Sequence, residues 1–314
     1  MSPKNNFTPE GASRCRAGAS GLLDRSAKHQ FQLYLRAGGP YGQGPGSSII
    51  WGLSGPSQAV KSPCYGSEMG LKGAIRSHPL AFLFGLAAVS LLGLLFVPPI
   101  PQPQDYHQFA DQKTLLGIPN FWNVVSNLPF IAVGAMGLQY FRRDLSAGVF
   151  FLGVFLTGFS SSYYHWNPND AGLFWDRLPM AIAFMAILAN VVEERIDAKV
   201  GKLLLWPLVL LGIVSLLWWM RTDDLRLYGW VQFFPCLVLP LMFWLFAPKY
   251  SGTWYWFAAA GCYLFAKVLE YSDAVIYSAG YHIMAGHALK HVAAAGACYA
   301  ILRAFQTRQA LVRN

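Results

Sequence analysis

Charged side chains are scarce in this 314-residue chain, since Asp, Glu, Lys and Arg make up 12% of it. Soluble domains carry roughly 25%. Because 54% of the residues are hydrophobic, the composition excludes an ordinary water-soluble domain and indicates a protein that lies in a lipid bilayer. The net charge of +9 does not indicate nucleic-acid binding, because the basic residues lie mainly in loops and termini.

The chain also lacks any CxxC pair. Three of its five cysteines lie in apolar stretches, which is typical of small core side chains. This pattern excludes a thiolate metal site and a disulfide framework. The cysteines are Cys15, Cys64, Cys236, Cys262 and Cys298.

Residues 1–76 are rich in Gly, Ser, Pro and basic residues, so we expect a disordered extension. Met69 is followed by Lys72, Arg76 and an uncharged run from 79 to 100, which resembles a signal anchor that begins at the true start. Residues 1–68 would then lie upstream of that start. No Ala-x-Ala-type site follows Phe96, so we predict that a transmembrane helix in 77–100 is retained, the alternative being a cleaved signal peptide.

Seven further apolar segments follow, most of them near the roughly 20 residues that span hydrocarbon. They are 121–141, 147–166, 174–192, 203–220, 229–247, 252–272 and 283–303. Backbone groups in lipid must bond internally, so we expect helices. The predicted fold is all-α and integral to the membrane: a seven-transmembrane-helix bundle at 121–304 with one extra N-terminal helix, an external loop at 101–120 and a cytoplasmic tail at 305–314.

Positive charge predicts the orientation of these helices, because cytoplasmic loops carry more Lys and Arg. One side holds twelve: Lys61, Lys72, Arg76, Arg142, Arg143, Arg195, Lys199, Lys202, Lys249, Arg303, Arg308 and Arg313. The other side holds six: Lys113, Arg177, Arg221, Arg226, Lys267 and Lys290. The asymmetry predicts that both ends of the eight-helix unit are cytoplasmic.

Ionisable groups inside a membrane segment are energetically costly, so their presence indicates a functional or structural role. In the last segment, His287 and His291 are four residues apart and share a helical face, where two imidazoles can hold one metal ion. A pair of hydrogen-bonded interior histidines is the alternative. Ser161 and His165 have the same spacing at the outer end of another helix. Counting the membrane crossings places the end of the helix with His165 on the same side as the start of the last helix, so all three imidazoles can meet at one depth. Three His plus a water is the ligand set of a catalytic zinc.

Other polar residues cluster at the same outer level. Asp176 opens the next helix and can accept a proton from a metal-bound water, or it can simply pair with Arg177. Glu270 and Asp273 end the sixth helix of the bundle and could orient a ligand histidine. A local Lys267–Glu270 pair is the alternative.

The opening segment of the bundle carries its own polar face. Asn123 and Asn127 share that face, near Ser126. Asn123 could support the histidines from a second layer of contacts, although amides at such positions also serve simply to hold helices together.

The pattern Ser161-x3-His165-x10-Asp176, then His287-x3-His291, with 121–123 reading Phe-Trp-Asn, resembles the alkaline ceramidase family. That family belongs to a larger group with the adiponectin receptors and the Per1-type proteins. The resemblance covers about residues 105–305. It implies a seven-helix bundle that holds Zn²⁺ on His165, His287 and His291.

In catalytic terms, the resemblance implies that Asp176 deprotonates the water and that Ser161 stabilises the oxyanion. The implied reaction is hydrolysis of an N-acyl sphingoid base, a membrane lipid, to a fatty acid and a free amine.

Eukaryotic relatives carry an acidic calcium site before the first helix. Here Asp105, Asp111 and Asn120 offer oxygens, but two carboxylates are few for Ca²⁺, which takes about six to eight oxygen ligands. The extra N-terminal helix is similar to the bacterial branch. This implies a bacterial inner membrane, a periplasmic active site and a substrate that is ceramide or another N-acyl lipid.

Two other classes stay open. A receptor or signalling protein on the same scaffold would use zinc structurally, as an adiponectin-receptor-like protein. A haem-bearing or ion-conducting protein is the third class, although His287 and His291 on adjacent turns of one helix suit axial haem ligation poorly.

Overall fold

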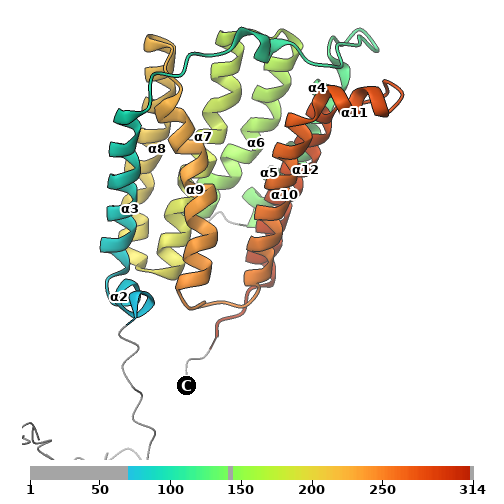
Figure 1. Ribbon diagram of the computed structural model, residues 1–314. Coiled ribbons are helices and arrows are strands. Elements are labelled where there is room, and N and C mark those ends of the chain that lie inside the picture. The colour runs from blue at the N-terminus through green and yellow to red at the C-terminus, as the bar shows by residue number, and fades with distance from the viewer. Residues whose placement is uncertain (1–69, 141–143, 312–314) are drawn as a thin grey trace, which may run out of the picture. The chain divides into compact units, whose positions relative to one another are not determined.

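The computed structural model describes residues 70–140 and 144–311. They fall within one unit of the chain, Tyr65–Asn314, and the regular structure that they form is helical (Figure 1). The predicted disordered extension lies outside the described residues as far as residue 69, as do the proposed start at Met69, Cys15 and Cys64. Cys236, Cys262 and Cys298 are free thiols.

A short helix, α2 (Leu71–Ser77), begins inside the region where we expected disorder. Its basic side chains hold it against the end of another helix. Arg76 Nε donates a hydrogen bond to the carbonyl of Leu245 at 2.8 Å, and Lys72 Nζ lies 5.0 Å from the centre of the Trp244 ring. These contacts explain why α2 is ordered although the composition of residues 1–76 predicts disorder.

Among residues 70–140 and 144–311, six helical segments are long and apolar enough to cross a membrane. The chain is therefore a multi-pass membrane protein, as its composition predicts. The segments are α3 (Pro79–Gly93) with η1 (Leu94–Phe96), α4 (Phe121–Val125) with α5 (Leu128–Tyr140), α6 (Leu145–Trp166), α7 (Asp170–Arg195), α8 (Ala198–Thr222) and α9 (Arg226–Leu245).

Two further long helices, α10 (Thr253–Tyr271) and α12 (Gly286–Thr307), pack against each other and fall where the sixth and seventh segments of the bundle were predicted. They do not belong to the six apolar segments. A bundle of seven spanning helices plus one therefore stays a prediction.

The first predicted segment of the bundle is broken rather than continuous. α4 ends at Val125 and α5 begins at Leu128. Pro129 has no N–H to donate to a carbonyl one turn earlier, which weakens the helix at this point. The side chain of Asn127 compensates by donating to the carbonyl of Asn123 at 2.8 Å. The break leaves Ser126 and Asn127 buried in the interior.

α7 lies at the centre of the bundle and is the neighbour of α6, α8 and α9. Its buried face includes Ala181, Ala186 and Ala189. Small side chains let helices approach closely in a bilayer, where packing rather than water expulsion drives their association. Asp176, near the first turn of this helix, is thereby held inside the bundle.

The connection between α3 and α4, residues 97–120, crosses one end of the bundle (Figure 1). We call it the strap. Its first part is fixed by the α8–α9 turn, because Asp223 Oδ1 accepts from the Gln102 N–H at 2.9 Å and the Leu225 N–H donates to the Ile100 carbonyl at 2.8 Å. The strap contains the short 3-10 helix η2 (Gln104–His107).

The last helix begins later than predicted. A short helix, α11 (Asp273–Ala279), follows α10, and a turn then leads into α12 at Gly286. Tyr281 and His282 in this turn have positive φ values of 53° and 59°, which end the helical path. The turn places the start of α12 at the same end of the bundle as the strap (Figure 1), and the His287 ring contacts that of Phe109 in the strap.

Candidate metal centre

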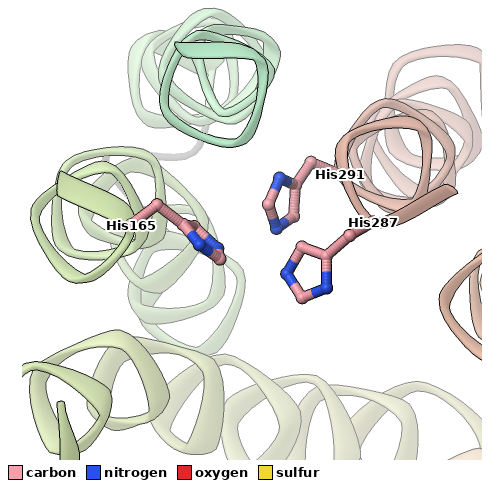
Figure 2. Close-up of side chains that lie close together, drawn as sticks. All are labelled: His165, His287 and His291. Atoms are coloured by element: carbon pink, nitrogen blue, oxygen red, sulfur yellow. The ribbon is translucent and has the colours of Figure 1, made fainter. Parts of the chain in front are cut away.

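Three histidines from two helices converge at the end of the bundle beneath the strap. His165 comes from the last turn of α6, and His287 and His291 come from the first turns of α12 (Figure 2). One ligand nitrogen of each ring lies within 4.8 Å of the others. The side chains are 1%, 6% and 6% exposed, respectively. The predicted convergence at one depth is therefore present in the fold.

A metal ligand must offer an unused ring nitrogen, and two of the histidines have one that is buried. Nδ1 of His165 and Nε2 of His287 are buried and have no hydrogen-bond partner within the described residues. Nδ1 of His291 is different, because the Ser126 hydroxyl lies 2.8 Å from it. That contact fixes the ring and leaves Nε2 as the free nitrogen. The donor set fits a metal ion that takes three imidazoles.

Asp176 and Ser161 accompany the histidines. Ser161 lies one turn before His165 on α6, and its side chain interacts with the Asp176 carboxylate. Oδ1 of Asp176 is buried and has no partner in the described part of the chain. Asp176 and Ser161 line the same cavity as His291. The structure thus brings a carboxylate, a hydroxyl and one of the three imidazoles to one cavity.

The strap places an aromatic ring against two of the three histidines. The Phe109 ring centre lies 4.7 Å from that of His165 and 4.5 Å from that of His287. Further along the strap, Asp273 Oδ2 accepts from the Ala110 N–H at 3.0 Å. Phe109 therefore lies between two of the imidazoles and the rest of the strap.

The predicted supporting residues have mixed roles. Asp273 contacts the backbone N–H of His287, at 2.6 Å, rather than its ring. Asn123 donates to the Asp111 carbonyl at 3.1 Å and so ties the strap to α4. Glu270 contacts cations, namely Lys267 and, at 2.5 Å, Lys290. The local Lys267–Glu270 pair considered from the sequence is present, with a second lysine added.

The residues considered for calcium have other contacts here. Asp111 Oδ1 accepts from the Lys113 N–H at 3.1 Å, and Asn120 Nδ2 donates to the His165 carbonyl at 2.9 Å. Asp105 lies exposed in η2. Asn120 has a positive φ of 47°, a conformation that Asn tolerates better than most residues.

A cavity of about 550 Å³ extends from this polar group into the bundle. Its polar end includes Ser161, Asp176 and His291, and its remaining walls are largely apolar. The apolar part includes Phe184, Leu239, Phe243, Ala260 and Ile301. Such a cavity can hold hydrocarbon chains while it presents a polar group to the histidines.

Some contributors were not found from the sequence. The sequence places Ser126 beside two asparagines without indicating its contact with His291, although a hydroxyl in an apolar helix is a signal for a polar partner. Phe109 carries no such signal, because its position over the histidines depends on the path of the strap. Lys290 was counted only as a loop charge, yet it lines the cavity.

Comparison with known proteins relates part of the chain to one family. Residues 114–247 match the model of the family described as Ceramidase. The match spans α4 to α9 and so includes Ser161, His165 and Asp176, whereas His287 and His291 lie beyond it. No curated protein matches the chain.

Proposed function

We propose that this chain, of which residues 114–247 match the ceramidase family, is a zinc-dependent hydrolase of amide bonds that acts inside the membrane. The proposed substrate is ceramide or a related N-acyl lipid, and the products are a fatty acid and a free amine. One observation carries the proposal: three buried imidazoles meet within 4.8 Å, and one of them, His291, lines a largely apolar cavity together with Asp176.

Zinc fits the residues that are present. His165, His287 and His291 supply three imidazole nitrogens, and two of these rings have a buried nitrogen that finds no partner in the described part of the chain. Three protein ligands leave one position for water or substrate, as in catalytic zinc sites. When bound, zinc supplies a Lewis acid and lowers the pKa of a water to about 7. The hydroxyl of Ser126 would keep His291 in the ligating orientation.

Asp176 is proposed as the proton carrier. Its Oδ1 has no partner among the described residues, so it is available to take a proton from the attacking water and to deliver it to the nitrogen of the leaving amine. The Ser161 hydroxyl interacts with the same carboxylate. As a donor beside the reacting carbonyl, this hydroxyl would stabilise the developing oxyanion.

The cavity and the strap define how the lipid would lie. The apolar walls suit an acyl chain, and the polar end places an amide next to Asp176 and His291. Phe109 excludes bulk water from the outer side of the histidines. The charge asymmetry of the loops supports an orientation with this end outside the cytoplasm and the C-terminus within it. We extend the proposal to a periplasmic-facing site in a bacterial inner membrane.

The test combines turnover with metal content. Purified protein is incubated with a panel of N-acyl lipids, with and without chelator, and the products are identified by mass spectrometry. We expect Asp176→Asn to retain the metal and to lose about 10²–10⁴-fold in kcat. The double variant His287→Ala/His291→Ala should lose the metal as well, as measured by elemental analysis.

Asp197→Asn is the matched control, because Asp197 caps α8 and asparagine caps helices equally well. It should behave as wild type. Wild-type turnover in Asp176→Asn, or stoichiometric metal in the double-histidine variant, would contradict the proposal. Binding of a partner by wild type and Asp176→Asn alike, with no lipid turnover by the wild type, would favour the receptor class instead.

A further inference from the structure

Arg177 is a buried cation at the polar end of the cavity. It follows Asp176 in α7, is 7% exposed, and lines the cavity together with Asp176 and Lys290. Adjacent residues of a helix do not face each other, so Asp176 is poorly placed to neutralise it. No ion pair of its guanidinium is found among the described residues.

Three aromatic rings surround this guanidinium. Its central carbon lies 5.5 Å from the ring centre of Tyr106, 4.7 Å from that of Trp219 and 4.9 Å from that of Tyr228. The rings come from the strap, α8 and α9, so several elements fix the plane of the side chain. Aromatic faces attract a cation, but they do not satisfy N–H groups that point out of the cage. Nη1 of Arg177 is buried and has no partner within the described residues.

The neighbouring charges leave the polar end positive. Glu270 is already shared by Lys267 and Lys290. With Arg177 these are three cations, against the two carboxylates of Glu270 and Asp176, which leaves an excess of one positive charge at the cavity. Burying an unpaired charge is costly unless a partner satisfies it. The missing partner is an anion.

We propose that Arg177, supported by Lys290, forms a subsite for an anionic oxygen group on the amphiphile that occupies the cavity. A planar guanidinium presents paired N–H donors that match phosphate, sulfonate and carboxylate. The inference rests on the proposed function for its occupant, a lipid amide. The anion then comes from one of two sources: an acidic head group on the substrate, or the carboxylate of the released fatty acid.

The test measures binding without turnover. Full-length protein in neutral detergent is treated with chelator, and dissociation constants are measured for two matched pairs of probes. The first pair is N-palmitoyl sphingosine and its 1-phosphate, and the second is hexadecanol and palmitate. We expect wild type to bind the anionic member of at least one pair about tenfold or more tightly, the gain of a charge-assisted hydrogen bond.

Arg177→Gln should abolish that preference. The matched control is Arg195→Gln, because Arg195 is also buried on α7 and also has an unpartnered Nη1, whereas its Nη2 donates to Thr253 Oγ1 at 2.9 Å. Arg195 does not line the cavity, so its variant should keep the wild-type preference. Loss of preference in the phosphate pair assigns the subsite to the head group, and loss in the palmitate pair assigns it to the product.

Equal binding of both members of each pair by wild type would overturn the inference, as would preferences that survive Arg177→Gln. If Arg177→Gln does not fold, Arg177→Lys keeps the charge but loses the planar fork, and the preference should fall in that variant. An anion preference in a protein that hydrolyses no amide lipid would refute the proposed enzyme and leave this subsite standing. Turnover of an amide lipid without any anion preference would support the proposed enzyme and refute this subsite.

Discussion

One carboxylate oxygen of Asp273 accepts a hydrogen bond from the backbone N–H of His287 at 2.6 Å, and the other accepts from the N–H of Ala110 at 3.0 Å. A single side chain thus joins the first turn of α12 to the strap that lies over the histidines. The N-cap residue of α12, Ala285, has no side-chain acceptor, so Asp273 takes over that function.

Removing this carboxylate should loosen both attachments. We expect Asp273→Ala to lower the free energy of unfolding by about 1–3 kcal/mol, because two donors lose their acceptors. Asp273→Asn keeps one acceptor oxygen and should lie between Asp273→Ala and wild type. Thermal unfolding and amide hydrogen exchange at Ala110 and His287 are the measurements. Unchanged exchange at both amides in Asp273→Ala would show that the bridge does not hold the strap.

The Ser126 hydroxyl should tune metal affinity through His291. Partners that orient a ligand histidine typically contribute about 10–100-fold to metal affinity, so Ser126→Ala should weaken zinc binding by about that factor. Competition with a chromophoric chelator measures it. Ser162→Ala is the control, since the hydroxyl of Ser162 donates only to the carbonyls of Val124 and Gly158. Equal affinities for the two variants would contradict this role.

The start of α12 depends on a glycine that touches α10. A Cβ at Gly286 would lie 2.2 Å from the Leu269 carbonyl oxygen, whereas one at Gly296 in the same helix would lie 4.0 Å from Cys262 Sγ. Gly286→Ala should therefore displace His287, reduce bound metal and destabilise by about 1–3 kcal/mol. Gly296→Ala should be neutral or stabilising, by up to about 1 kcal/mol, because alanine favours helix.

Metal content reports the displacement of His287 in the two glycine variants, and melting temperature reports the change in their stability. A Gly286→Ala protein with full metal occupancy and an unchanged melting temperature would show that α10 and α12 can move apart without consequence for the site.

The turn that anchors the strap should respond to acid. Hydrogen bonds from the Arg226 side chain lower the pKa of Asp224 to about 2, and this residue also accepts weakly from the Ile100 N–H. The unfolded value is about 3.9, so the folded state binds protons less readily. The stabilisation is complete above about pH 4 and is lost as the pH falls through about 2.

Asp224→Asn tests this dependence. Its melting temperature should lie below that of wild type at neutral pH, and the difference should shrink as the pH approaches about 2, where wild-type Asp224 is itself protonated. A difference that stays constant from pH 7 to pH 2 would show that the charge of Asp224 does not anchor the turn.

The local pattern of the amino-acid sequence determines several features of this protein. Scarce charge and long apolar runs determine that it lies in a membrane, because neither a soluble surface nor exposed backbone can be sustained with that composition. The four-residue spacing of His287 and His291 determines that they share a face, since helical geometry is local. Counting the crossings placed His165 at the same end, and the structure confirms this.

Tertiary structure alone decided which side chains meet. Ser126 contacts His291, Phe109 covers His165 and His287, and Lys290 joins Lys267 on Glu270 through the packing of helices and a strap that are distant in the chain. The aromatic cage around Arg177 likewise draws on three separate elements. Periodicity fixes the face of a helix on which a residue lies, but the partner it finds there depends on close packing of many side chains at once.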